Sequence, residues 1–235
     1  MAKWLIDERP TRGEFVGELR RARVQIESAG TAATSPVAMR LRDIVVDDNR
    51  KLFGGVFSGA QVRIDALVVQ GNLLDADSTS MYTPFTTRYN DVRNGQRLFA
   101  DPGLIAYAGR PKHFLDIALL ISRDTKNSDD LAALLSANLN SPKVRSALTA
   151  LAGLAVAAPQ VAAIAGGIAA AATLADVAYT LIRSVADKTI GFYRGCRLEY
   201  PDQFGLGRNP KQDGQSYHVK GMSFWFDVVR TDGGN

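Results

Sequence analysis

One cysteine and two histidines are the residues of this 235-residue chain that could support nucleophilic catalysis. Cys196 would need His113 or His218 as its base, because a thiol attacks as the thiolate. Arg194 and Arg197 flank the cysteine in the run GFYRGCRLEY and could lower its pKa. A cysteine at alternate spacing in a strand is, however, more often a small core residue. We therefore expect a non-catalytic protein and keep a cysteine-dependent hydrolase as one alternative.

Acidic residues follow two of the expected strands and could hold a calcium ion. Asp75 and Asp77 lie in LLDADSTSMYTPF, and Asp124 and Asp129 lie in SRDTKNSDD. Calcium takes about six to eight oxygen ligands, which carboxylates and carbonyls from one edge could supply. Turn preference explains the first pair without a metal, and helix capping explains Asp129 with Asp130. We expect no cofactor, with calcium at Asp75, Asp77, Asp124 and Asp129 as the alternative.

Longer catalytic and nucleotide-binding motifs are missing from the sequence. It has no G-x-S-x-G elbow, no Walker loop and no H-E-x-x-H, and Pro210 in FGLGRNP replaces the third glycine of a dinucleotide fingerprint. Arginines cluster in the N-terminal strands, but Glu18, Glu27, Asp43 and Asp65 are interspersed among them. This mixture, with a net charge of only +4, is typical of a solvated face. We therefore expect no nucleic-acid partner.

The elements that must position these residues are mostly β-strands, because apolar and polar residues alternate along much of the chain. The expected strands are residues 23–27, 39–46, 61–70, 82–89, 103–108, 114–122, 191–200 and 216–230. Residues 114–122, FLDIALLIS, are nearly continuously apolar, as a central strand requires. Seven or eight short strands with polar turns predict an antiparallel sandwich.

Between residues 128 and 188 the apolar period becomes helical, which predicts an insertion in the β framework. Ser128 and Ser141 are the expected N-caps of the first two helices, and Pro159 opens the third. The expected helices cover about residues 129–139, 141–157 and 159–187. The predicted fold is therefore α+β, a mainly antiparallel β-sandwich with an inserted α-helical hairpin. Its parts are residues 1–22 as an N-terminal segment, 23–127 and 189–232 as the sandwich, and 128–188 as the helical insertion.

Thirty consecutive residues, from Ser146 to Ala175, carry no charge. The stretch exceeds the ~20 apolar residues that span a bilayer, but 14 of its residues are alanine and few are strongly lipophilic. It predicts two helices that form a hairpin near Pro159 and approach a neighbour closely. The larger apolar residues are expected to contact a partner subunit or a membrane: Leu148, Leu151, Leu154, Val161, Ile164, Ile168 and Leu174.

The position of the acidic loops at strand ends resembles the C2-like fold, an eight-stranded antiparallel sandwich whose apical loops often hold calcium through aspartates. The resemblance rests on the pair Asp75 and Asp77 with the group Asp124, Asp129 and Asp130, and it covers about residues 23–123 and the closing strands. It implies a calcium site at those aspartates. The chain departs from the pattern where Asp124 lacks a second aspartate two residues later and where a helical insertion replaces a short loop.

The hairpin is similar in composition to the hydrophobic hairpin of pore-forming colicins, over some 30 residues. We expect a non-catalytic interaction or effector module whose hairpin packs on a protein partner, on a second copy of the chain, or on membrane lipid. A conditional pore-forming or membrane-inserting bacterial effector is the alternative from this resemblance. Charged residues break every N-terminal apolar run before signal-peptide length, so we expect a cytoplasmic protein, membrane-associated under the alternative.

Overall fold

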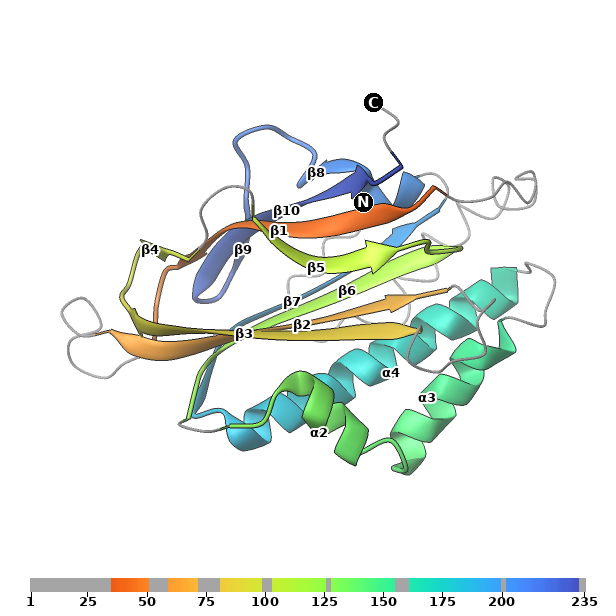
Figure 1. Ribbon diagram of the computed structural model, residues 1–235, viewed down its shortest axis with the longest axis horizontal. Coiled ribbons are helices and arrows are strands. Elements are labelled where there is room, and N and C mark those ends of the chain that lie inside the picture. The colour runs from red at the N-terminus through yellow and green to blue at the C-terminus, as the bar shows by residue number, and fades with distance from the viewer. Residues whose placement is uncertain are drawn as a thin grey trace.

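Two antiparallel sheets stack face to face, and three helices cover the outer face of one of them (Figure 1). The computed structural model describes residues 35–50, 59–71, 81–98, 103–125, 128–154, 161–199 and 202–232. The strand expected at residues 23–27 lies outside them. The described residues confirm the α+β class with mainly β content.

Sheet A is the sheet that the helices cover, and its strand order is β3–β2–β6–β7. Its strands are β2 (Ala60–Gln70), β3 (Tyr82–Val92), β6 (Phe114–Arg123) and β7 (Lys188–Leu198). All neighbours are antiparallel. β6 is buried at every position except its last, which confirms the central strand expected from its continuous apolar run.

Sheet B is built around the antiparallel pair of β1 (Val37–Val46) and β10 (Met222–Arg230). On one side β1 pairs with β4 (Gln96–Arg97) and β5 (Leu104–Gly109). On the other side β10 pairs with β8 (Gly207–Asn209) and β9 (Tyr217–Val219). The single strand expected at residues 216–230 is therefore wrong: a turn at Lys220 and Gly221 folds it into a hairpin of β9 and β10.

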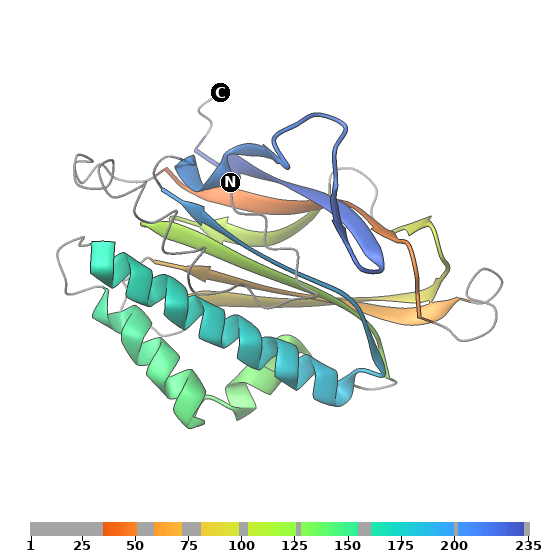
Figure 2. The same cartoon turned by 180° about the vertical axis from the view of Figure 1, so that it is seen from behind.

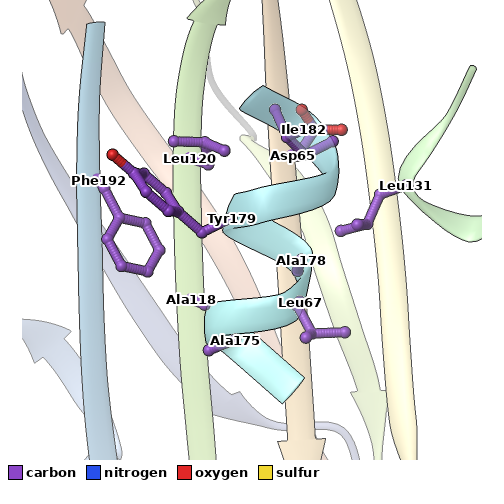
Figure 3. Close-up of a pocket in the computed structure, with 10 residues that line it drawn as sticks. All are labelled: Asp65, Leu67, Ala118, Leu120, Leu131, Ala175, Ala178, Tyr179, Ile182 and Phe192. Atoms are coloured by element: carbon purple, nitrogen blue, oxygen red, sulfur yellow. The ribbon is translucent and has the colours of Figure 1, made fainter. Parts of the chain in front are cut away.

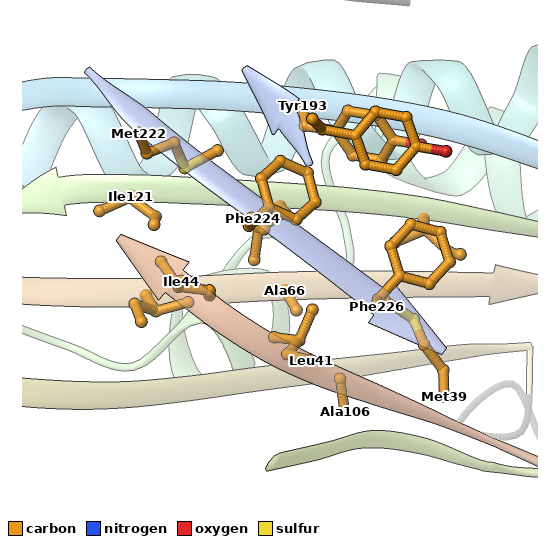
Figure 4. Packing of buried hydrophobic residues seen from close by; sticks show 14 of the residues in the cluster. Met39, Leu41, Ile44, Ala66, Ala106, Ile121, Tyr193, Met222, Phe224 and Phe226 are labelled. Atoms are coloured by element: carbon orange, nitrogen blue, oxygen red, sulfur yellow. The ribbon is translucent and has the colours of Figure 1, made fainter. Parts of the chain in front are cut away.

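The facing sides of the two sheets share one apolar core. Figure 4 shows Leu41 of β1, Phe224 and Phe226 of β10, Ala66 of β2 and Tyr193 of β7 within it. The ring of Tyr193 lies edge-on to Phe224, with centroids 5.0 Å apart. Aromatic contacts of this kind add to the area that the core buries and fix how the sheets stack.

The helical insertion lies between β6 and β7 and consists of α2 (Leu131–Ala137), α3 (Pro142–Gly153) and α4 (Val161–Val185). Figure 2 shows α4 running along the outer face of sheet A with α3 beside it. Ser141 is the N-cap of α3, as expected, because its hydroxyl accepts from the Val144 N–H at 3.4 Å. The N-cap expected at Ser128 is wrong, since α2 begins after Asp130.

A glycine sets how closely the hairpin approaches sheet A. A Cβ added at Gly167 would lie 2.2 Å from Leu154 Cδ1 and 3.1 Å from Phe114 Cε1. At the neighbouring Gly166 an added Cβ would meet nothing within 4 Å. Gly167 is therefore required for the contact between α4, the end of α3 and the sheet, whereas Gly166 has no such role.

The variant Gly167→Ala is expected to destabilise the protein by about 1–3 kcal/mol, because its methyl group overpacks this contact. Gly166→Ala is the matched control, and helix propensity predicts that it stabilises the protein by about 1 kcal/mol. Urea unfolding of both variants measures the two free energies. A shift of the same sign and size in both would contradict the packing role of Gly167.

Candidate functional site

The interface between the hairpin and sheet A contains two buried arginine–aspartate pairs. Arg63 and Asp65 of β2 form the first, with Nε and Nη2 of the arginine each 2.7 Å from a carboxylate oxygen. Arg194 of β7 and Asp116 of β6 form the second, at 2.9 and 2.5 Å. Arg194 also donates to the Ile168 carbonyl of α4 at 3.3 Å. Both pairs are bidentate, the strongest geometry for an arginine and a carboxylate.

Burial makes both pairs costly to ionise. Desolvation raises the pKa of Asp65 and of Asp116 above its ordinary value, and the paired arginines oppose that rise only in part. Burial alone would lower the pKa of Arg194, but Asp116 outweighs it, so the arginine stays charged. Because desolvation offsets much of the attraction, such pairs add little net stability.

Arg63 connects sheet A to the start of the helical insertion. Its side chain is fully buried, and its Nη1 donates to the Ser128 hydroxyl at 2.7 Å and to the Asp129 carbonyl at 2.9 Å. Thr86 of β3 then donates its hydroxyl to Asp65 and accepts from the Leu131 N–H at 2.9 Å. A side chain of the sheet therefore caps α2, which explains why Ser128 does not.

Two of the four expected calcium ligands, Asp124 and Asp129, lie among the described residues; Asp75 and Asp77 lie outside them. Asp124 accepts from Arg88 Nε at 2.8 Å, and Arg63 Nη1 lies 3.7 Å away. Asp129 is exposed. Among the described residues no three acidic, histidine or cysteine side chains gather as a metal site would need. Two guanidinium groups thus account for the charge of Asp124, and calcium binding stays a prediction.

The apolar residues expected to contact a partner or a membrane lie mostly on sheet A. Five are buried in the cluster between the helices and the sheet, Leu148 is half-buried against it, and Val161 begins α4 with a side chain outside the described set. The five buried residues are Leu151, Leu154, Ile164, Ile168 and Leu174. Contact of these seven residues with a partner or with lipid stays a prediction. In the described arrangement such a contact would require the helices to separate from sheet A.

The packing beneath α4 leaves little free space. Figure 3 shows a cavity between Tyr179 of α4, Phe192 of β7 and Leu120 of β6, with the carboxylate of Asp65 at one end. The rings of Tyr179 and Phe192 lie 5.0 Å apart, centroid to centroid. The cavity volume is about 10 Å³, room for at most about one water molecule. This cavity cannot hold an organic substrate.

Cys196 is half-buried and lies opposite Asp116 in the ladder of β6 and β7. Burial, and then the charge of Asp116, raises the pKa of its thiol well above the ordinary value. The backbone of His113 bonds to Glu199 at the end of that ladder, and His218 is exposed on β9. The described surroundings of Cys196 therefore favour the unreactive thiol over the thiolate.

The outer face of the hairpin is neutral near its tip. The exposed residues there have small side chains or none: Ala150, Ala152, Gly153, Ala162, Gly166 and Ala169. We call these six residues the hairpin tip face. An added Cβ at Gly153, as at Gly166, would meet nothing within 4 Å. Packing among the described residues does not require glycine at either position, and Gly153 is the last residue of α3, where glycine is common.

Sequence reasoning missed the buried arginines. It treated Arg63 as part of a solvated basic cluster, and Arg194 and Arg197 only as neighbours of the cysteine. Arg197 is buried on the opposite side of β7, where Nη2 donates to the Tyr217 hydroxyl at 2.7 Å. The available signal was an aspartate within a continuous apolar strand, Asp116 in FLDIALLIS, which requires a buried cationic partner.

The chain matches no protein-family model and no curated protein. The structure supports a mainly antiparallel fold compatible with a β-sandwich that carries a helical insertion. The C2-like and colicin-like resemblances remain proposals.

Replacement of Arg194 by methionine is expected to destabilise the protein by about 3–5 kcal/mol, because it leaves Asp116 buried without its charge partner. The double variant Arg194→Met with Asp116→Leu removes both charges and should recover most of that loss. Urea unfolding compares the two. If the double variant is as unstable as the single one, the loss comes from packing of the arginine stem and not from the unpaired carboxylate.

Cys196 is expected to react with iodoacetamide at pH 7 at least about tenfold more slowly in the folded protein than in urea, because its raised pKa keeps the thiol protonated. Mass spectrometry of timed samples measures the two rates. Equal rates would show an accessible thiolate and would favour the cysteine-dependent hydrolase.

Proposed function

We propose that the protein is a non-catalytic interaction module that presents the hairpin tip face to a protein partner. The observation that carries the proposal is Gly166, a glycine inside α4 with open space among the described residues where a Cβ would lie. Glycine inside a helix costs about 1 kcal/mol relative to alanine. Gly167 is explained by internal packing and Gly153 by its place at the end of α3, whereas Gly166 has neither explanation. A partner backbone that approaches the face closely would explain Gly166.

The way the hairpin is held supports this role. The large apolar residues of α3 and α4 anchor the two helices to sheet A, and Arg194 bonds to the backbone of α4. The hairpin tip face is therefore fixed before a partner arrives, and a fixed surface loses little conformational entropy on binding. Its neutral residues would require no desolvation of charge.

A membrane-inserting effector is the second candidate, and the observation that favours it is the composition of α4. Ala162–Val185 is long and apolar enough to cross a membrane, with a mean hydropathy of 1.5, and 44% of its most apolar window is buried. Insertion would require the hairpin to leave sheet A. Rehydration of the pairs formed by Arg63 and Arg194 would lower the cost of that step.

A photo-crosslinking amino acid placed at Gly166 in the full chain tests the protein-partner role. We expect one discrete protein adduct in cells that express the chain, because this position lies within the contact. The same amino acid at Thr180, exposed on α4 outside the hairpin tip face, is the matched control and should give none. Equal labelling at the two positions, or no protein adduct at Gly166, would count against the proposal.

Dye release from anionic phosphatidylglycerol vesicles tests the second candidate. Release by the full chain that is lost in Thr173→Asp and retained in Ala162→Asp would favour membrane insertion, because Thr173 lies at the centre of the apolar span and Ala162 at its first residue. A charge at the centre of the inserted helix costs about 3 kcal/mol. No release by the parent protein would discard it.

A further inference from the structure

The face of sheet B that points away from sheet A is not covered by any of the described helices, since α2, α3 and α4 all lie on sheet A (Figure 1 and Figure 2). On β10 the side chains of Phe224 and Phe226 belong to the core between the sheets. Successive side chains of a strand point to opposite faces, so Trp225 and Asp227 point outward. We call this surface the outer face of sheet B, and its tryptophan is only half-buried.

Trp225 is held between two guanidinium groups. Cζ of Arg42 lies 5.2 Å from the centroid of the indole ring, and Cζ of Arg208 lies 3.9 Å from it. Arg42 is on β1 and Arg208 on β8, the strands that flank β10 on opposite sides, so one guanidinium approaches the ring from each side. The indole N–H points to the carboxylate of Asp43, at 3.4 Å. This arrangement leaves no ring face open for a nucleobase to stack on.

The carboxylates of this face already have arginine partners. Asp227 forms a bidentate pair with Arg40, at 2.8 and 2.6 Å, and Asp43 pairs with Arg97 at 2.7 Å. Arg208 is different, because its Nη2 donates to a backbone carbonyl and its Nε is buried without a hydrogen-bond partner among the described residues. No described carboxylate therefore neutralises Arg208, and its charge favours an anionic ligand.

An apolar side chain lies on the same face. Ile105 of β5 is opposite Arg40 in the strand ladder, which places both side chains on one side of the sheet. It is 57% exposed, the one large apolar side chain that is exposed among the described residues. Tryptophan and arginine are enriched among the residues that contribute most to protein–protein binding. The outer face of sheet B thus combines an unneutralised arginine, a tryptophan and an exposed isoleucine.

We propose that the outer face of sheet B binds an acidic segment of a partner protein. The carboxylates of the segment pair with Arg208, and its apolar side chains contact Ile105 and the exposed part of Trp225. Charge complementarity carries this choice of partner. Asp43 and Asp227 oppose a continuous anionic surface, such as a membrane or a phosphate backbone. A peptide presents its carboxylates at separate positions with apolar side chains between them, so it can avoid both aspartates.

Fluorescence anisotropy of a fluorescein-labelled peptide of alternating glutamate and leucine, added to the full chain, tests the proposal. We expect a Kd of about 100 µM and no binding of the same peptide with glutamine in place of glutamate. Arg208→Gln removes the unneutralised charge and is expected to raise the Kd at least about fivefold. Arg145→Gln is the matched control, because Arg145 is exposed on α3 and should leave the Kd unchanged.

Ile105→Gln repeats the test without altering the contact between Arg208 and Trp225, and it guards against misfolding of the first variant. We expect it to raise the Kd at least about threefold, because it removes apolar contact area. Phosphatidylglycerol vesicles and a single-stranded oligonucleotide are the competing anionic probes. No binding of the glutamate peptide, a Kd that neither variant changes, or tighter binding of a competing probe that Arg208→Gln abolishes would overturn the proposal. The surface is independent of the hairpin tip face, and Gly166→Asp should not change the Kd.

Discussion

The central strands of sheet A, β2 and β6, are buried on both faces of the sheet, and this constraint governs the rest of the structure. β2 and β6 carry buried side chains at consecutive positions, so the sheet needs a cover on the side away from sheet B. The helices that form this cover must not bury an unpaired charge of their own, and every charged side chain of the sheet that they cover must have a partner. A buried unpaired charge costs several kcal/mol. α3 and α4 meet the first condition because their charged residues, Lys143, Arg145, Asp176 and Arg183, are all exposed. The pairs at Arg63 and Arg194 meet the second.

The same constraint decides what the helices can offer to another molecule. Their large apolar side chains are used to cover sheet A, and their outer face near the tip retains mainly alanine and glycine. Contact with a partner there would depend on close backbone approach, not on large side chains inserted into pockets.

Much of this fold could be predicted from local patterns. The alternation in residues 61–70 and 82–89, and the continuous run 114–122, correspond to β2, β3 and β6. Ser141 followed by Pro142 located the start of α3. Local signals succeed here because period and capping depend on neighbours in the sequence.

Features that depend on residues far apart could not be predicted in the same way. The hydroxyl of Ser128 bonds to Arg63 instead of capping α2, across 65 positions of sequence. The partner of Asp116 is 78 residues away, and nothing local to either residue identifies the other. Even so, an aspartate within an apolar central strand indicates that a cationic partner exists, though not which one it is.

The cap of α2 has a consequence for the order in which the chain folds. Its first N–H is bonded by Thr86, a residue of β3 that precedes it by 45 positions. α2 has only seven residues, too few to persist alone in water. Its first turn gains this bond only once the neighbouring strands of the sheet are assembled, so we expect the helical layer to consolidate late, on a preformed β surface, during refolding.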